Sequence, residues 1–102
     1  MNMDEIWNQV FQDKIFETAV NAVKEEYDYA KKKWNSETTT SGGNPSPAEF
    51  LLYISHYVHL ATTHATQVPD PESTRLVQDA MRKIANLAIT SMIQNGIVER
   101  TP

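Results

Sequence analysis

Residues 37–49 read ETTTSGGNPSPAE, and this stretch decides how the chain of 102 residues is divided. Its glycines, prolines and hydroxyl side chains cannot propagate a helix, so residues 35–46 are expected to form a loop. Ser46 and Glu49 then have the spacing of a capping box, and Pro47 suits a first helical turn. The stretch therefore predicts a loop that ends where a new helix begins.

The segment after this loop has the pattern of a helical hairpin. Apolar residues recur at helical spacing over about residues 47–66 and again over about residues 71–95. On a helical wheel of the first segment, the predicted core arc is Phe50, Leu51, Ile54, Val58, Ala61 and Ala65, with Tyr53, Tyr57, Leu60 and His64 along one edge. Residues 68–71, VPDP, supply the turn, and Asp70 within them is expected to cap the second helix of the hairpin. That helix should end at Gly96 in a left-handed conformation, with Ile97 packing back onto it.

The segment before the loop is expected to be one helix over about residues 4–33. Its apolar face loses register near residues 12–14, and Trp7 and Val10 fall outside it. Two interpretations are open: a bend at residues 12–14, or an N-terminal turn that packs on a different surface, such as another subunit. The predicted apolar face consists of Phe11, Ile15, Phe16, Ala19, Ala22, Val23, Tyr27 and Ala30.

The last helix carries more apolar surface than one neighbour can cover, so it should contact two. Its predicted core face is Leu76, Val77, Ala80, Ile84, Leu87 and Ala88. We expect a single all-α domain over residues 1–102, a three-helix up-down arrangement assembled as a homo-oligomeric helical bundle. The predicted oligomer interface consists of Trp7, Ala85, Ile89, Met92 and Ile93.

The amino-acid composition and net charge exclude several classes of function. The chain has no cysteine, which removes disulfides, thiolate metal sites and cysteine nucleophiles. A net charge of -4 argues against a partner such as duplex nucleic acid, which needs a dense basic face. No signal peptide or membrane span is recognisable, so no membrane partner and a cytoplasmic location are expected. A small anion held by one or two arginines fits this composition.

Candidate chemical groups are present but poorly arranged for catalysis. The three histidines are His56, His59 and His64, and one helix cannot direct all three at a single metal ion. Residues 25–28 hold three carboxylates, which we interpret as a solvated charged face. We therefore predict no catalytic residue, no metal site and no cofactor.

Two groupings are candidates for ligand binding. Tyr53, Tyr57 and His64 follow one edge of a helix, where they form either a stacking strip or packing against the first helix. Arg75, Arg82 and Lys83 form the second grouping. Arg82 lies beside Ile89 and Ile93 on the helical wheel, and an arginine at such an apolar edge suits an interface ion pair or a phosphate.

Residues 46–100 resemble a group of small, uncharacterised, all-helical proteins of bacteriophages and prophages. The resemblance covers about half the chain and rests on five segments: Ser46-Pro47-Ala48-Glu49-Phe50-Leu51, Tyr53-Ile54, Tyr57, Met81-Arg82-Lys83-Ile84-Ala85 and Gln94-Asn95-Gly96. It implies a phage-type accessory protein, which would act in the cytoplasm of the bacterial host. These motifs are helix caps and core patterns.

The arrangement also looks like the all-alpha pyrophosphohydrolase scaffold of the MazG type, although the pairing of Glu-x-x-Glu with Glu-x-x-Asp ligands is missing. The hairpin around residues 80–94 is similar to helical phage sponges for cyclic nucleotides. These resemblances imply a non-catalytic protein that binds or sequesters a nucleotide-like signal between subunits and counters bacterial immunity. The alternatives are a divergent magnesium-dependent nucleotide pyrophosphohydrolase and a helical protein-protein interaction module.

Overall fold

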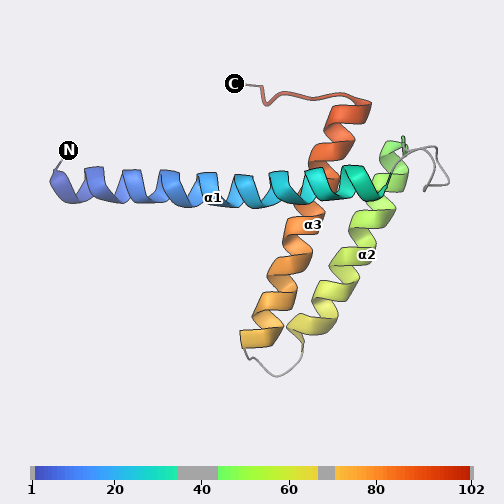
Figure 1. The fold of residues 1–102 in the computed structure, drawn as a ribbon, viewed down its shortest axis with the longest axis horizontal. Coiled ribbons are helices and arrows are strands. Elements are labelled where there is room, and N and C mark those ends of the chain that lie inside the picture. Colours follow the sequence, from blue (N-terminus) through green and yellow to red (C-terminus); the bar gives the residue numbers. More distant parts are fainter. Residues whose placement is uncertain (1, 35–43, 67–70, 102) are drawn as a thin grey trace.

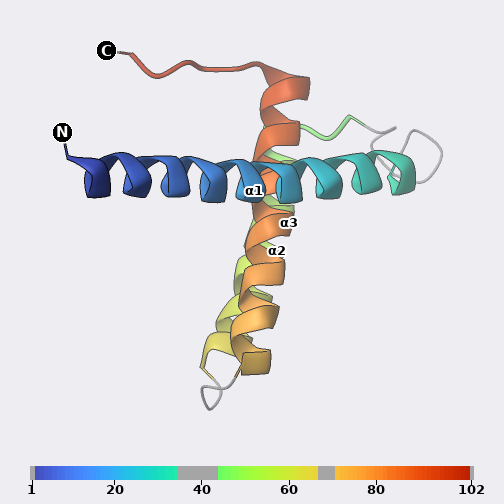
Figure 2. The same ribbon diagram turned by 60° about the vertical axis from the view of Figure 1, so that its left-hand side comes forward.

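The computed structural model describes residues 2–34, 44–66 and 71–101, and these contain three helices (Figure 1). They are α1 (Met3–Lys33), α2 (Pro47–Ala65) and α3 (Pro71–Asn95). The predicted all-α fold is confirmed, and each helix boundary lies within one residue of its predicted position. Helices α2 and α3 form an antiparallel hairpin, and α1 lies across α3 at a steep angle (Figures 1 and 2).

The start of α2 follows the predicted capping box. The Glu49 backbone N–H donates to Ser46 Oγ at 3.2 Å, and the Ser46 N–H donates to Glu49 Oε1 at 3.1 Å. Pro47 opens the helix, where the absence of its N–H loses no helical bond. Most of the predicted loop and the cap at Asp70 lie in residues 35–43 and 67–70, outside the described residues.

Helix α1 begins earlier than predicted and runs without interruption. A second capping box starts it, because Asn2 Oδ1 accepts from the Glu5 N–H at 2.9 Å and Glu5 Oε2 accepts from the Asn2 N–H at 3.3 Å. Figures 1 and 2 both show a straight helix through residues 12–14. The interpretation of a bend there is therefore wrong, and the change of apolar face occurs within a straight helix.

Helix α3 ends at Gly96 as predicted, with one difference. Gly96 has φ +113°, a conformation that favours glycine, and its N–H donates to the Met92 carbonyl at 3.0 Å. Ile97 was expected to pack back on the helix, but its residue surface is 67% exposed. That prediction is wrong because residues 96–101 leave the helix and stay exposed.

The core lies between α2 and α3 and is thin. Phe50, Ala61 and Ala80 are its buried apolar residues. The buried arc of α2 is rotated from the predicted one: Tyr57 is half-buried, whereas Val58, which was assigned to the core, is 47% exposed. The hairpin therefore buries an edge of α2 that the helical wheel placed outside its core.

Helix α1 packs on α3 through its C-terminal third only. Ala22, Val23, Tyr27 and Ala30 are half-buried there, whereas residues 2–21 are all exposed. Half of the predicted apolar face of α1 is thus not a core face: Phe11, Ile15, Phe16 and Ala19 are exposed. Among the described residues, α3 contacts both other helices, which confirms the prediction of two neighbours, and α1 does not contact α2. The aromatic edge of α2 therefore does not pack on the first helix.

The whole molecule is extended for its length. Its radius of gyration is 16.9 Å, against about 13 Å for a compact domain of this size. Its accessible surface is 8225 Å², whereas a folded monomer of this mass exposes about 5,800 Å². None of the three helices, over the residues described, is both long enough and apolar enough to cross a membrane.

Candidate functional site

The crossing of α1 and α3 is held by an ion-pair network. Arg82 on α3 donates from Nε to Glu26 Oε1 on α1 at 2.8 Å, and from Nη2 to Asp79 Oδ1 at 2.5 Å. Lys83 Nζ lies 3.0 Å from the other oxygen of Asp79. The Glu26 side chain is only 11% exposed, so its charge depends on Arg82 for compensation.

The network shifts the pKa values of Asp79 and Arg82. The hydrogen bond from Lys83 is the largest cause that lowers the pKa of Asp79, and Arg82 adds to it against the opposing effect of burial. The hydrogen bond to Glu26 is the largest cause that raises the pKa of Arg82. Both residues therefore stay charged at neutral pH.

An open cleft of about 500 Å³ lies beside this network, between α1 and α3. Its apolar wall combines small side chains with the thioether of Met81, which is 52% exposed. Gln78 and Asp79 add polar groups, and two arginines complete its lining. The lining residues are Ala19, Ala22, Val23, Arg75, Gln78, Asp79, Met81, Arg82 and Ala85.

Arg75 is the cation of the cleft that can most easily change partner. Its Nε and Nη2 donate to the two carboxylate oxygens of Glu72, at 3.0 Å and 2.6 Å, but both side chains are 63% exposed. The bond to Glu72 raises the pKa of Arg75, which stays cationic. An exposed pair of this kind contributes little to stability because water screens it, so an anion can compete for the guanidinium. Arg82, in contrast, is occupied by two carboxylates.

The structure divides the six predicted ligand residues into two places. Arg75 and Arg82 line the α1–α3 cleft, whereas Tyr57 lies on the α2 side, with Lys83 Nζ 5.7 Å from its ring centroid. Tyr53 is 40% exposed and packs edge-on against Phe50. The aromatic and arginine groupings therefore do not form one site.

His64, the remaining member of the aromatic grouping, has a polar atom without a partner. Its Nδ1 is buried and forms no hydrogen bond to the described residues. Across the part of the chain that the structure describes, no three His, Asp or Glu side chains converge where they would hold a metal ion. The geometry of the described residues thus gives this imidazole no metal-binding arrangement.

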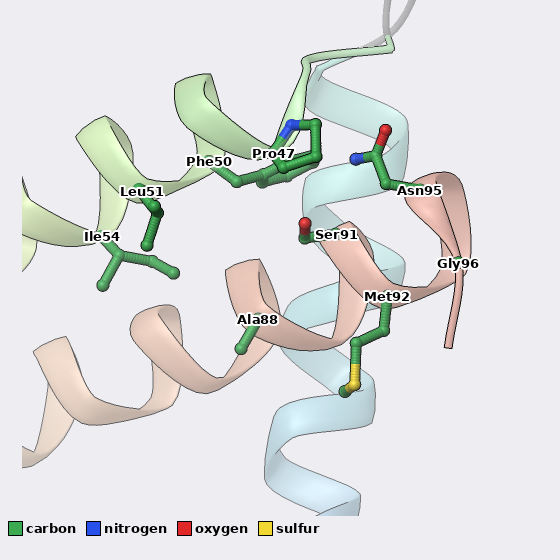
Figure 3. Close-up of a pocket in the computed structure, with 9 residues that line it drawn as sticks. All are labelled: Pro47, Phe50, Leu51, Ile54, Ala88, Ser91, Met92, Asn95 and Gly96. Atoms are coloured by element: carbon green, nitrogen blue, oxygen red, sulfur yellow. The ribbon is translucent and has the colours of Figure 1, made fainter. Parts of the chain in front are cut away.

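A second hollow, of about 400 Å³, lies where the start of α2 meets the end of α3 (Figure 3). Leu51 and Ile54 of α2 lie across from Ala88 and Ser91 of α3. The residues that line it are Pro47, Phe50, Leu51, Ile54, Ala88, Ser91, Met92, Asn95 and Gly96, none of them charged. This hollow therefore offers an anion no ionic partner.

The predicted oligomer interface is also divided. Trp7 is 64% exposed on α1, and Ile93 is 54% exposed on α3. Ile89 and Met92 are exposed to a smaller extent, at 38% and 42%. Ala85, however, lines the cleft that faces the chain's own α1. Part of the surplus apolar face of α3 is thus used within the chain.

Glu26 is the residue of this site that the sequence analysis missed, because residues 25–28 were interpreted as one solvated face. The signal was present, since Glu26 lies on the same side of the helix as Ala22, Val23 and Ala30. A carboxylate inside an apolar stripe requires a cation from a neighbouring helix. Arg82 was the candidate at an apolar edge.

The chain matches no protein-family model, and no curated protein or solved structure shows significant similarity to it. Any proposal for a ligand therefore has to rest on the shape and charge of the cleft itself. Those properties are an apolar wall, one exchangeable arginine and a volume of about 500 Å³.

Proposed function

We propose that the chain is a non-catalytic binding protein that takes a small nucleotide-like anion in the α1–α3 cleft. The observation that carries this proposal is the combination of an apolar wall with Arg75 in the lining of a cleft of about 500 Å³. Binding sites for small molecules typically have about 300–1,000 Å³ and a mostly apolar lining with few polar groups. The cleft fits this description.

The lining also suits the parts of such a ligand. Small alanines and Met81 give a flat ring an apolar contact, and the Gln78 amide both donates and accepts hydrogen bonds. Arg75 supplies planar donors that a phosphate accepts in place of Glu72, whose carboxylate now takes both Nε and Nη2. Asp79 and Glu72 limit the local positive charge, which favours a ligand with one or two phosphates over a triphosphate.

The resemblance to phage proteins supports a role for such binding. A protein that holds a nucleotide signal without converting it lowers the free concentration of that signal. Sequestration of this kind needs a tight site and no catalytic group. We propose this role for the cleft, with bacterial immune signalling as the process that it counters.

A thermal-shift panel tests the proposed ligand class. The panel consists of nucleoside monophosphates, cyclic mononucleotides and cyclic dinucleotides, at about 10 to 100 times a micromolar dissociation constant. One of them should stabilise the protein by about 1.4–2.7 kcal/mol and raise its melting temperature by several degrees. If none does, the proposal is wrong.

Arg75→Ala locates the site. This variant should fold normally, because the exposed pair with Glu72 contributes little, but it should lose the ligand-induced shift. Arg100→Ala is the matched control, since Arg100 is an exposed arginine beyond the end of α3. Equal shifts in Arg75→Ala and the wild type would place the ligand elsewhere.

A further inference from the structure

The two ends of α1 are apolar on opposite sides. We define the N-terminal stripe as Met3, Ile6, Trp7, Val10 and Phe11. The stripe that packs on α3 contains Ala22, Val23, Tyr27 and Ala30. At 100° per residue, the mean directions of the two stripes differ by about 180°. A straight helix therefore cannot turn both stripes toward its own α3.

Polar residues follow the same division. The side of α1 that carries the N-terminal stripe continues with Lys14, Glu17 and Asn21, whereas the opposite side begins with Asn8 and Gln12. Each half of α1 is thus amphipathic in its own direction. This pattern indicates two different packing partners for one helix, of which the hairpin of the same chain is one.

We propose that the second partner is another copy of this chain, with the two N-terminal stripes packed against each other as an antiparallel helix pair. The stripe residues are 41–64% exposed, and Trp7 and Phe11 are among the most exposed of them. A two-fold axis between Trp7 and Val10 places the same residues on both sides of the contact, as in most homodimers. This pairing goes beyond the proposed ligand and does not depend on it.

The accessible surface of the molecule is large enough to include an interface with a second copy. The accessible surface exceeds the value for a folded monomer by about 2,400 Å², whereas each partner in a standard interface buries about 800 Å². In addition, the part of α1 that bears the stripe extends well away from the hairpin (Figures 1 and 2). The hairpin therefore leaves this part of α1 uncovered.

Charge favours the antiparallel direction. Lys14 continues the line of the N-terminal stripe by one turn, and Asp4 stands beside Met3 at the other end. In an antiparallel pair centred between Trp7 and Val10, Lys14 of each copy comes opposite the acidic first turn of the other. A parallel pair would instead bring the two Asp4 carboxylates together.

Light scattering at about 50 µM tests the self-association with a matched pair of variants. The wild type should have at least twice the mass of the chain. Trp7→Glu should raise the dissociation constant at least about a hundredfold, because a buried aromatic is lost from both copies. Asn8→Glu places the same charge on the next residue and should change the constant less than about threefold.

Three results would overturn the proposal. A monomeric wild type at this concentration would exclude self-association through the stripe. An unchanged mass in Trp7→Glu would exclude the stripe from the interface. Equal weakening by Trp7→Glu and Asn8→Glu would show that the effect is not specific to one face. Circular dichroism verifies that both variants keep their helical content.

A charge reversal tests the antiparallel register. Lys14→Glu should weaken the assembly by about fivefold, since two exposed ion pairs are replaced by repulsion. Adding Asp4→Lys to Lys14→Glu should restore most of the wild-type dissociation constant. A double variant no tighter than Lys14→Glu alone would contradict the register. Thermal shifts with nucleotides, measured separately, decide the proposed ligand independently of this result.

Discussion

At the scale of single residues, Arg82 fixes how α1 meets the hairpin. It holds a carboxylate from its own helix and one from α1, 56 positions away in the sequence. Sequence patterns identified Arg82 as an interface or phosphate residue, but not its partner. Which of Glu25, Glu26 and Asp28 pairs with Arg82 depends on which side of α1 meets α3, and only the packed structure shows this.

Neighbouring glutamates provide a direct test of this contact. Glu26→Gln should lower the free energy of unfolding by about 1–2 kcal/mol, because a charge-assisted bond to Arg82 becomes a neutral one. Glu25→Gln changes an exposed neighbour and should stay within about 0.5 kcal/mol of the wild type. Urea titrations of both variants measure the difference. Equal losses in the two variants would exclude a special role for Glu26.

The pH dependence of stability tests Asp79. Lys83 and Arg82 hold the pKa of Asp79 below its ordinary value of 3.8. A carboxyl group with a lowered pKa in the folded state stabilises the fold above its ordinary pKa, and this stabilisation is lost as the pH falls through the lowered pKa. The wild type should therefore lose stability below about pH 4, and Asp79→Asn should lose less. Parallel stability curves between about pH 2 and about pH 6 would contradict the account.

At the scale of helices, local signals determined the boundaries and long-range packing determined the faces. The boundary at Ser46–Glu49 is set by hydrogen bonds within four residues, so the sequence was sufficient to predict it. The side of α2 that is buried depends on α3, and the helical wheel misplaced Tyr57 and Val58 for that reason. The sequence showed that the apolar face of α1 changes side along the helix. It did not show that this change occurs within one straight helix.

The α2 cap gives a prediction at this scale. Ser46→Ala removes the oxygen that accepts from the Glu49 N–H and should cost about 1 kcal/mol of unfolding free energy. Ser55→Ala, in the exposed middle of α2, should be neutral or slightly stabilising, because alanine has the higher helix propensity. Thermal unfolding of the two variants compares them. A cost at Ser55 as large as that at Ser46 would show that the cap has no particular role.

At the scale of the whole molecule, the chain leaves much of its apolar surface uncovered. Its core contains only Phe50, Ala61 and Ala80 as buried apolar residues among those described, and the N-terminal two thirds of α1 buries none. The sequence predicted this incompleteness from the surplus of apolar faces. It did not predict that α1 would cross α3 steeply, because crossing angles depend on how side chains from both helices interlock.

The most direct test of the central claim, that a second copy covers the N-terminal stripe, is the fluorescence of Trp7. The chain has two tryptophans, so Trp34→Phe leaves Trp7 as the only one. In that variant Trp7 should be shielded from acrylamide at about 50 µM and become accessible on dilution, as the mass measured by light scattering falls to that of one chain. A Trp7 that is fully accessible to acrylamide at the higher concentration would contradict the account.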